Sequence, residues 1–203
     1  MTRILLIRHG ETELTGQVLY GRMPGVHLSA NGCRQAELLG HALKNGYHVD
    51  QLISSPLERA LETARYLSET LHLPIATDEQ IIELDYGTWL GKSFEEIRGL
   101  ESWHHYNRLR SLVSPPEGEL LLQVQARAWR ALDRVISRFQ NSAKATVAMV
   151  SHGDVIRALL ILFLGMPLDY IHRLEVSPGS LNEIVFNGRH AKVVRINQTF
   201  WSD

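Results

Sequence analysis

The stretch Ile4-Leu5-Leu6-Ile7, which runs directly into Arg8-His9-Gly10, decides the expected fold of this chain. Four consecutive apolar residues make a run of strand length, and such runs are typical of strands buried on both faces, as in parallel sheets. Val147 to Val150 repeats the pattern, and Gln51 to Ile53 is a shorter version of it. These runs predict a sheet of buried, mostly parallel strands.

Helical periods separate the expected strands. Apolar residues recur at three- and four-residue steps from 57 to 71 and from 124 to 139, as on the buried face of a helix. Ser29 is a suitable N-cap for a helix from Ala30 to about Lys44, which Asn45-Gly46 would end. Alternating strands and helices predict an α/β fold, a three-layer α/β/α sandwich with helices on both faces of the sheet.

The end of the chain predicts an antiparallel addition to that sheet. Leu181 to Phe186 and Ala191 to Ile196 flank Asn187-Gly188, a strong hairpin signal, so we expect the sheet to be mixed. The weakest periodicity lies from Phe94 to Val113, which we interpret as an exposed helical excursion. Since no repeat, low-complexity tract or linker interrupts the pattern, we expect one domain over residues 1–203.

The composition excludes several classes of protein. Of 203 residues, 44% are hydrophobic and 21% are charged, which is the range of globular rather than disordered chains. A net charge of −1 gives no field that would attract nucleic acid or a membrane, so we expect neither as a partner, and an anion site must be a local cluster. Three features favour a cytoplasmic protein. Cys33 is a single cysteine and cannot form an internal disulfide, the apolar run at the start is too short for a signal peptide, and the interrupted stretch Val155 to Met166 is too short to cross a membrane.

Basic side chains follow the expected strands. Ligands of α/β sheets gather at the carboxyl ends of the strands, so residues at these positions are the first candidates for a site. They are Arg8, His9, Arg59 and His152. Several cations buried together are costly without a partner, and arginine supplies forked donors that match phosphate oxygens. This edge of the sheet therefore predicts a site for a compact anion such as phosphate.

The sequence blocks around these residues resemble the histidine phosphatase superfamily, also called the phosphoglycerate-mutase-like family. Arg8-His9-Gly10-Glu11-Thr12 is similar to the signature that follows the first strand in that family. The family has three further blocks, and this chain has a similar stretch for each: Ser54 to Ala60 with Thr63-Ala64 for the second, Glu83-x-x-x-Gly87-x-Trp89-x-Gly91 for the third, and Ser151-His152-Gly153 for the fourth. Four blocks in the right order, from residue 8 to residue 153, make the resemblance specific and imply the phosphoglycerate-mutase-like fold over the whole chain.

The resemblance implies a phosphatase of the histidine acid type, a phosphomonoester hydrolase that needs neither a metal nor a cofactor. His9 would be the nucleophile that forms a phosphohistidine, and Glu83 would protonate the leaving oxygen and then activate water. The residues that would hold the phosphoryl group are Arg8, Thr15, Arg59, His152 and Gly153. Asp85 lies two positions from Glu83 and is the other candidate for the acid.

The chain departs from the family pattern in two places. Thr15 stands where many members have an asparagine that helps bind phosphate, so we expect its hydroxyl to donate one bond instead. Leu120 follows Glu119 where members often have a serine, which leaves that contact open. The residues expected over the pocket are Trp103, His104, His105, Tyr106 and Arg108, and they either select the substrate or form a packed helix face.

The expected partner is a small phosphorylated metabolite, bound by a monomer or a homodimer. A phosphotransferase of the phosphoglycerate mutase type is the alternative, although glycolytic mutases are longer and carry a basic insertion where residues 92–116 are short here. Two further classes stay open: a metallohydrolase in which His9 and His152 hold a metal ion, and an inactive domain that only binds phosphorylated ligands.

Overall fold

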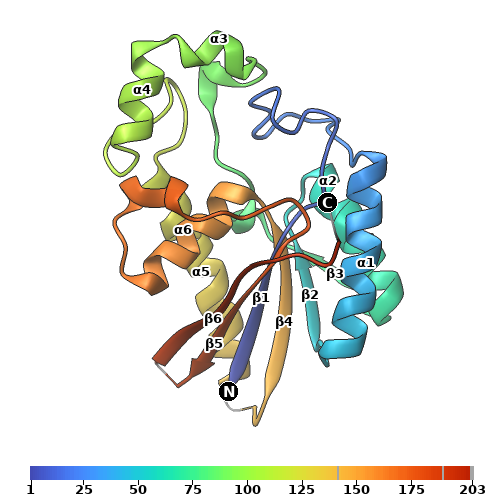
Figure 1. Ribbon diagram of the computed structural model, residues 1–203. Coiled ribbons are helices and arrows are strands. Elements are labelled where there is room, and N and C mark those ends of the chain that lie inside the picture. The colour runs from blue at the N-terminus through green and yellow to red at the C-terminus, as the bar shows by residue number, and fades with distance from the viewer. Residues whose placement is uncertain (141, 189, 202–203) are drawn as a thin grey trace.

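A mixed β-sheet lies at the centre of the protein, whose computed structural model describes residues 1–140, 142–188 and 190–201 (Figure 1). Within these residues six strands follow the order β3-β2-β4-β1-β5-β6. They are β1 (Thr2–Arg8), β2 (Gln51–Ser54), β3 (Ile75–Thr77), β4 (Ala145–Ser151), β5 (Leu181–Asn187) and β6 (His190–Gln198). The first four strands pair in parallel, whereas β5 and β6 are antiparallel, so the predicted mixed sheet is confirmed.

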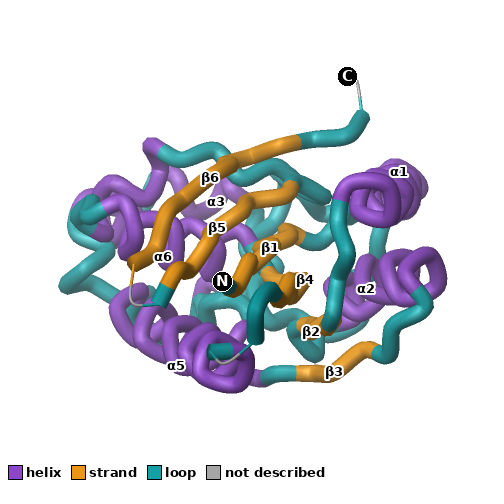
Figure 2. The backbone as a smooth tube through the Cα atoms, turned by 90° about the horizontal axis from the view of Figure 1, so that it is seen from below, coloured by secondary structure: helices purple, strands orange, loops and turns teal. Residues whose placement is uncertain are grey.

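Helices cover both faces of the sheet (Figure 2). The helices α1 (Ala30–Gly46) and α2 (Glu58–Leu71) lie on one face, and α5 (Leu121–Phe139) and α6 (Gly153–Leu164) lie on the other. The shorter elements are α3 (Phe94–Arg98), α4 (Glu101–Arg108) and the 3₁₀ turns η1 (Glu79–Ile81), η2 (Gly87–Trp89) and η3 (Leu168–Arg173). The three-layer α/β/α sandwich expected from the sequence is confirmed.

The period of two along β1 explains the two cores. Ile4 and Leu6 belong to the core that α5 and α6 cover, and Leu5 and Ile7 belong to the core beneath α1 and α2. All four are at most 1% exposed, as expected for a strand buried on both faces. The predicted cap of α1 is present, because the Ser29 hydroxyl accepts a bond from the Gly32 amide at 3.0 Å.

The excursion between residues 94 and 113 corrects one expectation. It consists of α3 and α4, but it is not exposed throughout: Ile97 and Tyr106 are fully buried and Arg110 is 2% exposed. Tyr106 packs edge-on against Trp89 at 5.4 Å between ring centroids, so this segment closes over the end of the sheet. In the described part of the chain, no helix has the length and apolar character that crossing a membrane requires.

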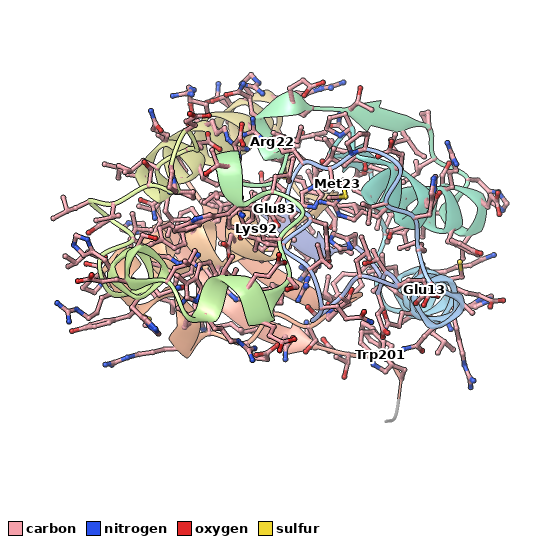
Figure 3. The ribbon with its side chains drawn as sticks, turned by 90° about the horizontal axis from the view of Figure 1, so that it is seen from above. Glu13, Arg22, Met23, Glu83, Lys92 and Trp201 are labelled. Carbon is pink, nitrogen blue, oxygen red and sulfur yellow. The ribbon has the colours of Figure 1, made fainter. Side chains whose placement is uncertain are left out.

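In-register pairing of parallel strands brings distant residues to the same edge of the sheet. Arg8 at the end of β1 is the register partner of Ser151 at the end of β4, so His9 and His152 emerge next to each other. Figure 3 looks onto this edge, with Glu83 near the centre of the view and Glu13 and Trp201 toward its periphery.

Candidate active site

A cavity of about 210 Å³ lies over the ends of β1 and β4. Of the residues predicted for catalysis and phosphate binding, those that line it are Arg8, His9, Glu83 and Gly153. Arg59 and His152 are fully buried beside His9. The structure therefore brings together residues that are up to 145 positions apart in the sequence, from 8 to 153.

The His9 imidazole is buried in a defined tautomer. Its Nδ1 lies 2.7 Å from the Gly10 carbonyl oxygen, which can only accept, so Nδ1 carries the hydrogen and Nε2 carries a lone pair. Burial, followed by the positive charges of Arg59 and Arg8, holds the pKa of His9 well below its usual 6.5. The ring is therefore neutral near pH 7 and keeps a nucleophilic nitrogen.

Arg59 connects the two histidines. From the first turn of α2, its Nε donates to His9 Nε2 at 3.3 Å, and its Nη2 lies 3.3 Å from His152 Nδ1 and 2.5 Å from the Gly21 carbonyl oxygen. His152 in turn lies 2.7 Å from the Ser55 hydroxyl through Nε2. Burial and the Arg59 charge also hold the pKa of His152 well below 6.5, so this ring too is neutral.

Two arginines at this end retain unused donors. Arg8 donates through Nη1 to the Val176 carbonyl oxygen at 2.7 Å. Its Nε, like Nη1 of Arg59, is buried and has no hydrogen-bond partner within the described ranges. Buried N–H groups without a partner are rare and costly, which is consistent with a site whose donors are completed by an anionic ligand.

Glu83 supplies a carboxyl group of raised pKa to the same cavity. Its pKa is raised from 4.5 to about 7, first because the side chain is buried and second because the Asp154 carboxylate lies close by. The Leu84 amide donates to Glu83 Oε1 at 2.8 Å, and this bond, with Arg59 and Arg8, limits the rise. A carboxyl group poised near pH 7 can both give and take a proton, as acid–base catalysis requires.

Asp154 and its partners form a cluster that the sequence reasoning did not assign to the site. The Asp154 carboxylate accepts from Arg110 Nη1 at 2.7 Å, from the Tyr86 hydroxyl at 2.8 Å and from Arg157 Nη1 at 3.3 Å. The two arginines overcome the effect of burial and hold the pKa of Asp154 well below its usual value. One available signal was the position of Asp154 directly after Ser151-His152-Gly153.

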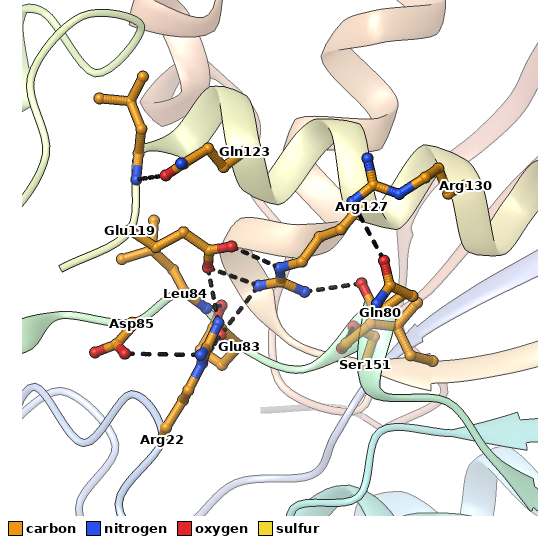
Figure 4. A network of polar contacts seen from close by, with 12 residues as sticks. Arg22, Gln80, Glu83, Leu84, Asp85, Glu119, Gln123, Arg127, Arg130 and Ser151 are labelled. Atoms are coloured by element: carbon orange, nitrogen blue, oxygen red, sulfur yellow. Dashed lines mark hydrogen bonds and ion pairs between the residues drawn. The ribbon is translucent and has the colours of Figure 1, made fainter.

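A second missed group holds the backbone of Glu83 (Figure 4). Its carbonyl oxygen accepts from Arg22 Nε at 2.7 Å and from Arg127 Nη2 at 3.1 Å. The Glu119 carboxylate bridges these guanidinium groups, at 2.8 Å from Arg22 Nη2 and 2.8 Å from Arg127 Nε. Three side chains from separate segments thus fix the position of the Glu83 backbone.

Two other groups of predicted residues lie apart from the end of the cavity that Arg8 and His9 line. The Thr15 hydroxyl lies 3.0 Å from the Thr12 amide and does not line the cavity, so its role in phosphate binding stays a prediction. The second group is the set of residues expected over the pocket. Trp103 lines the cavity and Tyr106 packs against Trp103, whereas the other three residues of this group are exposed on the outer side of α4. These three are His104, His105 and Arg108.

The donor set does not favour a metal ion. The His9 and His152 nitrogens that carry lone pairs both face the Arg59 guanidinium, a cation that would repel a metal bound between them. Within the described ranges, no three His, Cys, Asp or Glu side chains are grouped so as to hold a metal ion.

Comparison with known sequences gives a family match over nearly the whole chain. The sequence model described as "Histidine phosphatase superfamily (branch 1)" matches residues 4–199. A bifunctional protein of Mycobacterium tuberculosis is 34% identical over 200 residues, which are 98% of this chain and 54% of that protein. The chain thus spans about half the length of this curated relative.

Two further comparisons cover both partners almost completely. Phosphoserine phosphatase 1 of Hydrogenobacter thermophilus is 30% identical over 201 residues, 98% of this chain and 93% of that protein. A crystal structure of a phosphoserine phosphatase mutant from Entamoeba histolytica, in complex with phosphoserine, is 26% identical, with a TM-score of 0.85 and 97% of each chain covered.

Proposed function

The chain belongs to branch 1 of the histidine phosphatase superfamily, and from this and the geometry of the cavity we propose that it hydrolyses phosphate monoesters through a phosphohistidine on His9. The observation that carries the proposal is the pairing, in one cavity, of a neutral imidazole whose Nε2 carries the lone pair with a carboxyl group whose pKa is raised to about 7. The substrate would be a small phosphorylated metabolite.

The first half of the proposed reaction transfers the phosphoryl group to the protein. His9 Nε2 attacks phosphorus in line while the bond to the ester oxygen breaks, and Glu83 gives its proton to that oxygen, which leaves as an alcohol. Arg59 releases His9 Nε2, which it contacts in the free protein. The Arg59 guanidinium then faces the equatorial oxygens of the phosphoryl group, together with Arg8 and His152. The start of α6 at Gly153 adds amide groups on the same side.

The second half restores the protein. The Glu83 carboxylate, having lost its proton, takes one from a water molecule, whose oxygen attacks the phosphorus of phosphohistidine. The bond between phosphorus and His9 Nε2 breaks, inorganic phosphate leaves, and Glu83 is protonated again. No step needs a metal ion, because the arginines supply the positive charge that such an ion would provide.

Trapping the covalent intermediate tests this mechanism. A substrate labelled in its phosphoryl group, quenched in alkaline detergent within one turnover, should leave a base-stable, acid-labile label on His9. His9→Ala should abolish both label and turnover, while the exposed His104→Ala should keep both. Product formed without any labelled protein would point to direct attack by water and overturn the proposal.

The leaving group tests the role of Glu83. Glu83→Gln should slow turnover of alkyl phosphates strongly, whereas phosphorylation by p-nitrophenyl phosphate, whose leaving group needs little protonation, should survive and labelled protein should accumulate. The matched variant Asp85→Asn removes a 42%-exposed carboxylate that accepts from the Gly87 amide, and it should keep both activities. The reverse pattern would assign the acid to Asp85. Release of inorganic phosphate, rather than an isomeric phosphate ester, distinguishes the hydrolase from a mutase.

A further inference from the structure

A single peptide unit connects the proposed nucleophile to helix α1. The carbonyl oxygen of Gly10 accepts from His9 Nδ1 at 2.7 Å, and the amide of Glu11 donates to Gln35 Oε1 at 2.9 Å. Carbonyl and amide belong to the same planar unit, so the position of one fixes the position of the other. Two hydrogen bonds and one rigid plane therefore join Gln35 to the His9 ring. The inference that follows rests on the proposed function, in which His9 receives the phosphoryl group.

Gln35 occupies a position where an apolar side chain would be expected. It lies on the buried face of α1 and is 4% exposed, and Ala36 and Leu39 on the same helix are fully buried. Glutamine is rarely found in such surroundings without hydrogen-bond partners. Because the Glu11 amide can only donate, the side-chain oxygen of Gln35 faces it. The buried side chain of Gln35 thus serves the backbone behind His9.

A second helix holds the other side of Gly10. The Gly10 amide donates to Thr63 Oγ1 at 3.0 Å, and Thr63 is fully buried in α2. The Thr63 hydroxyl donates in turn to the Arg59 carbonyl oxygen at 2.8 Å. Side chains from two helices therefore fix the amides before and after the Gly10 carbonyl, and its oxygen stays directed at the His9 ring.

Close backbone packing brings α1 within reach of this segment. A Cβ at Gly10 would lie 2.5 Å from the Gly32 carbonyl oxygen, and a Cβ at Gly32 would lie 2.0 Å from the Glu11 carbonyl oxygen. Only glycine permits such an approach, so the first turn of α1 touches the segment directly. Gln35 lies one turn further along the same face of the helix, which places its side chain at the Glu11 amide.

The bond from Gln35 strengthens the acceptor of the His9 ring. Hydrogen bonds in a chain polarise one another, so a bond to the Glu11 amide raises the negative charge on the Gly10 oxygen. This charge stabilises the positive charge that the His9 ring gains when Nε2 bonds to phosphorus. The fixed carbonyl also keeps the ring in the orientation that directs Nε2 at the phosphoryl group. Both effects act on the rate of attack rather than on substrate binding.

We propose that Gln35 is a positioning residue for His9, which it orients and activates through the peptide unit between Gly10 and Glu11. Gln35 does not line the cavity over β1 and β4, so it would touch neither the substrate nor the reacting atoms. Its hydrogen bond goes to the backbone behind the nucleophile, not to the guanidinium groups that would hold the phosphoryl group. A change at Gln35 should therefore slow phosphorylation and leave substrate affinity unchanged.

Transient kinetics of two substitutions at this position test the proposal. Gln35→Met has a similar length but no oxygen to accept from the Glu11 amide, and it should slow phosphorylation of His9 by p-nitrophenyl phosphate about tenfold at saturating substrate. The substrate concentration that gives half the maximal rate should stay the same. Gln35→Glu keeps an oxygen acceptor and should recover most of the rate. The control Gln125→Met removes an amide that donates to the Ala158 carbonyl oxygen at 2.7 Å, away from the cavity, and should keep the natural rate.

Proton NMR reports on the hydrogen bond of His9 itself. The Nδ1 proton lies in a bond of 2.7 Å between nitrogen and oxygen, and it should give a resonance far downfield that His9→Ala lacks. Gln35→Met should move this resonance upfield, because the Gly10 oxygen becomes a weaker and less well placed acceptor. Gln35→Glu and Gln125→Met should leave it close to its natural position. A loss of stability without a change at the Gly10 carbonyl would not move it.

The two measurements are decisive together. In a folded Gln35→Met variant, a natural rate or an unmoved resonance would overturn the proposal, as would a Gln35→Glu variant as slow as Gln35→Met. If Gln35→Met does not fold, Thr63→Val and Thr63→Ser give the same comparison at the Gly10 amide with the same expected results, since valine lacks the hydroxyl and serine retains it. No label on His9 in the natural chain would instead refute the proposed phosphatase mechanism, and the resonance would still show whether Gln35 acts on the ring.

Discussion

Glu83→Gln should make the protein more stable at alkaline pH while it removes the proposed acid. In the folded protein the pKa of Glu83 is raised from 4.5 to about 7, mainly by burial. At pH values between these two, the folded state holds a proton that the unfolded state has released, so the natural protein loses stability as the pH rises. Glutamine has nearly the same shape, stays uncharged at every pH, and can still accept the bond from the Leu84 amide.

The size of the effect follows from the two pKa values. Holding the ionised carboxylate in the folded protein costs about 3 kcal/mol well above pH 7, since one pH unit corresponds to about 1.4 kcal/mol. At about pH 5 the cost is below about 1 kcal/mol, because Glu83 is then protonated in the folded state and only partly ionised in the unfolded state. The stability difference between Glu83→Gln and the natural protein should therefore grow by about 2 to 3 kcal/mol from about pH 5 to about pH 8.5.

Denaturant unfolding at the two pH values measures this difference directly. Every other titrating group is common to both proteins, so the change in the difference with pH isolates Glu83. The variant Glu37→Gln removes an exposed carboxylate from α1 and should show no such growth. A Glu83→Gln stability difference that stays constant between the two pH values would show that the Glu83 carboxyl is not held protonated, and the acid role would lose its physical basis.

Three further predictions concern activity. For an alkyl phosphate, kcat/KM should fall as the pH rises through about 7, because Glu83 must carry its proton, and a pH profile with no alkaline decline would contradict this. Glu119→Gln should lower kcat for alkyl phosphates about tenfold and affect p-nitrophenyl phosphate less, because it weakens the bridge between the two guanidinium groups that hold the Glu83 carbonyl oxygen. The variant Glu117→Gln, at an exposed position, serves as control. An equal loss of kcat on both substrates would argue for a general loss of structure. Exhaustive chelation should leave the rate unchanged, whereas a chelated, inactive protein that zinc or manganese restores would favour the metallohydrolase.

The regular part of the fold could be predicted from local sequence. Long apolar runs and helical periods located β1, β4, α2 and α5 because buried faces repeat with the geometry of the element. The strand β3 was missed, since its three residues lie at the edge of the sheet, partly or fully exposed, with no burial pattern to detect. The segment from Phe94 to Val113 was expected to be exposed because α3 and α4 are too short to show a period, whereas contacts with distant segments bury Tyr106 and Arg110.

Some residues of the candidate site could also be predicted from the sequence, whereas others could be found only in the structure. His9, Arg59 and His152 could be predicted because each follows a strand or opens a helix at the same edge of the sheet, and the sequence blocks mark them. Asp154 directly follows one block, but its proximity to Glu83 and Arg110 depends on how three separate segments fold together. Periodicity gives no information on such contacts, so the charge that raises the pKa of Glu83 could be found only in the structure.

The segment between β1 and α1 links the nucleophile to the acid through two consecutive residues. The carbonyl oxygen of Gly21 accepts from Arg59, which contacts His9, and the side chain of Arg22 donates to the Glu83 carbonyl oxygen. Gly21 has a φ of +36°, and a Cβ there would lie 2.7 Å from the Tyr86 ring, so a larger residue would displace the segment from both partners. Since one short stretch of backbone contacts the partners of both groups, the relative position of imidazole and carboxyl is determined by this segment as well as by the register of the sheet.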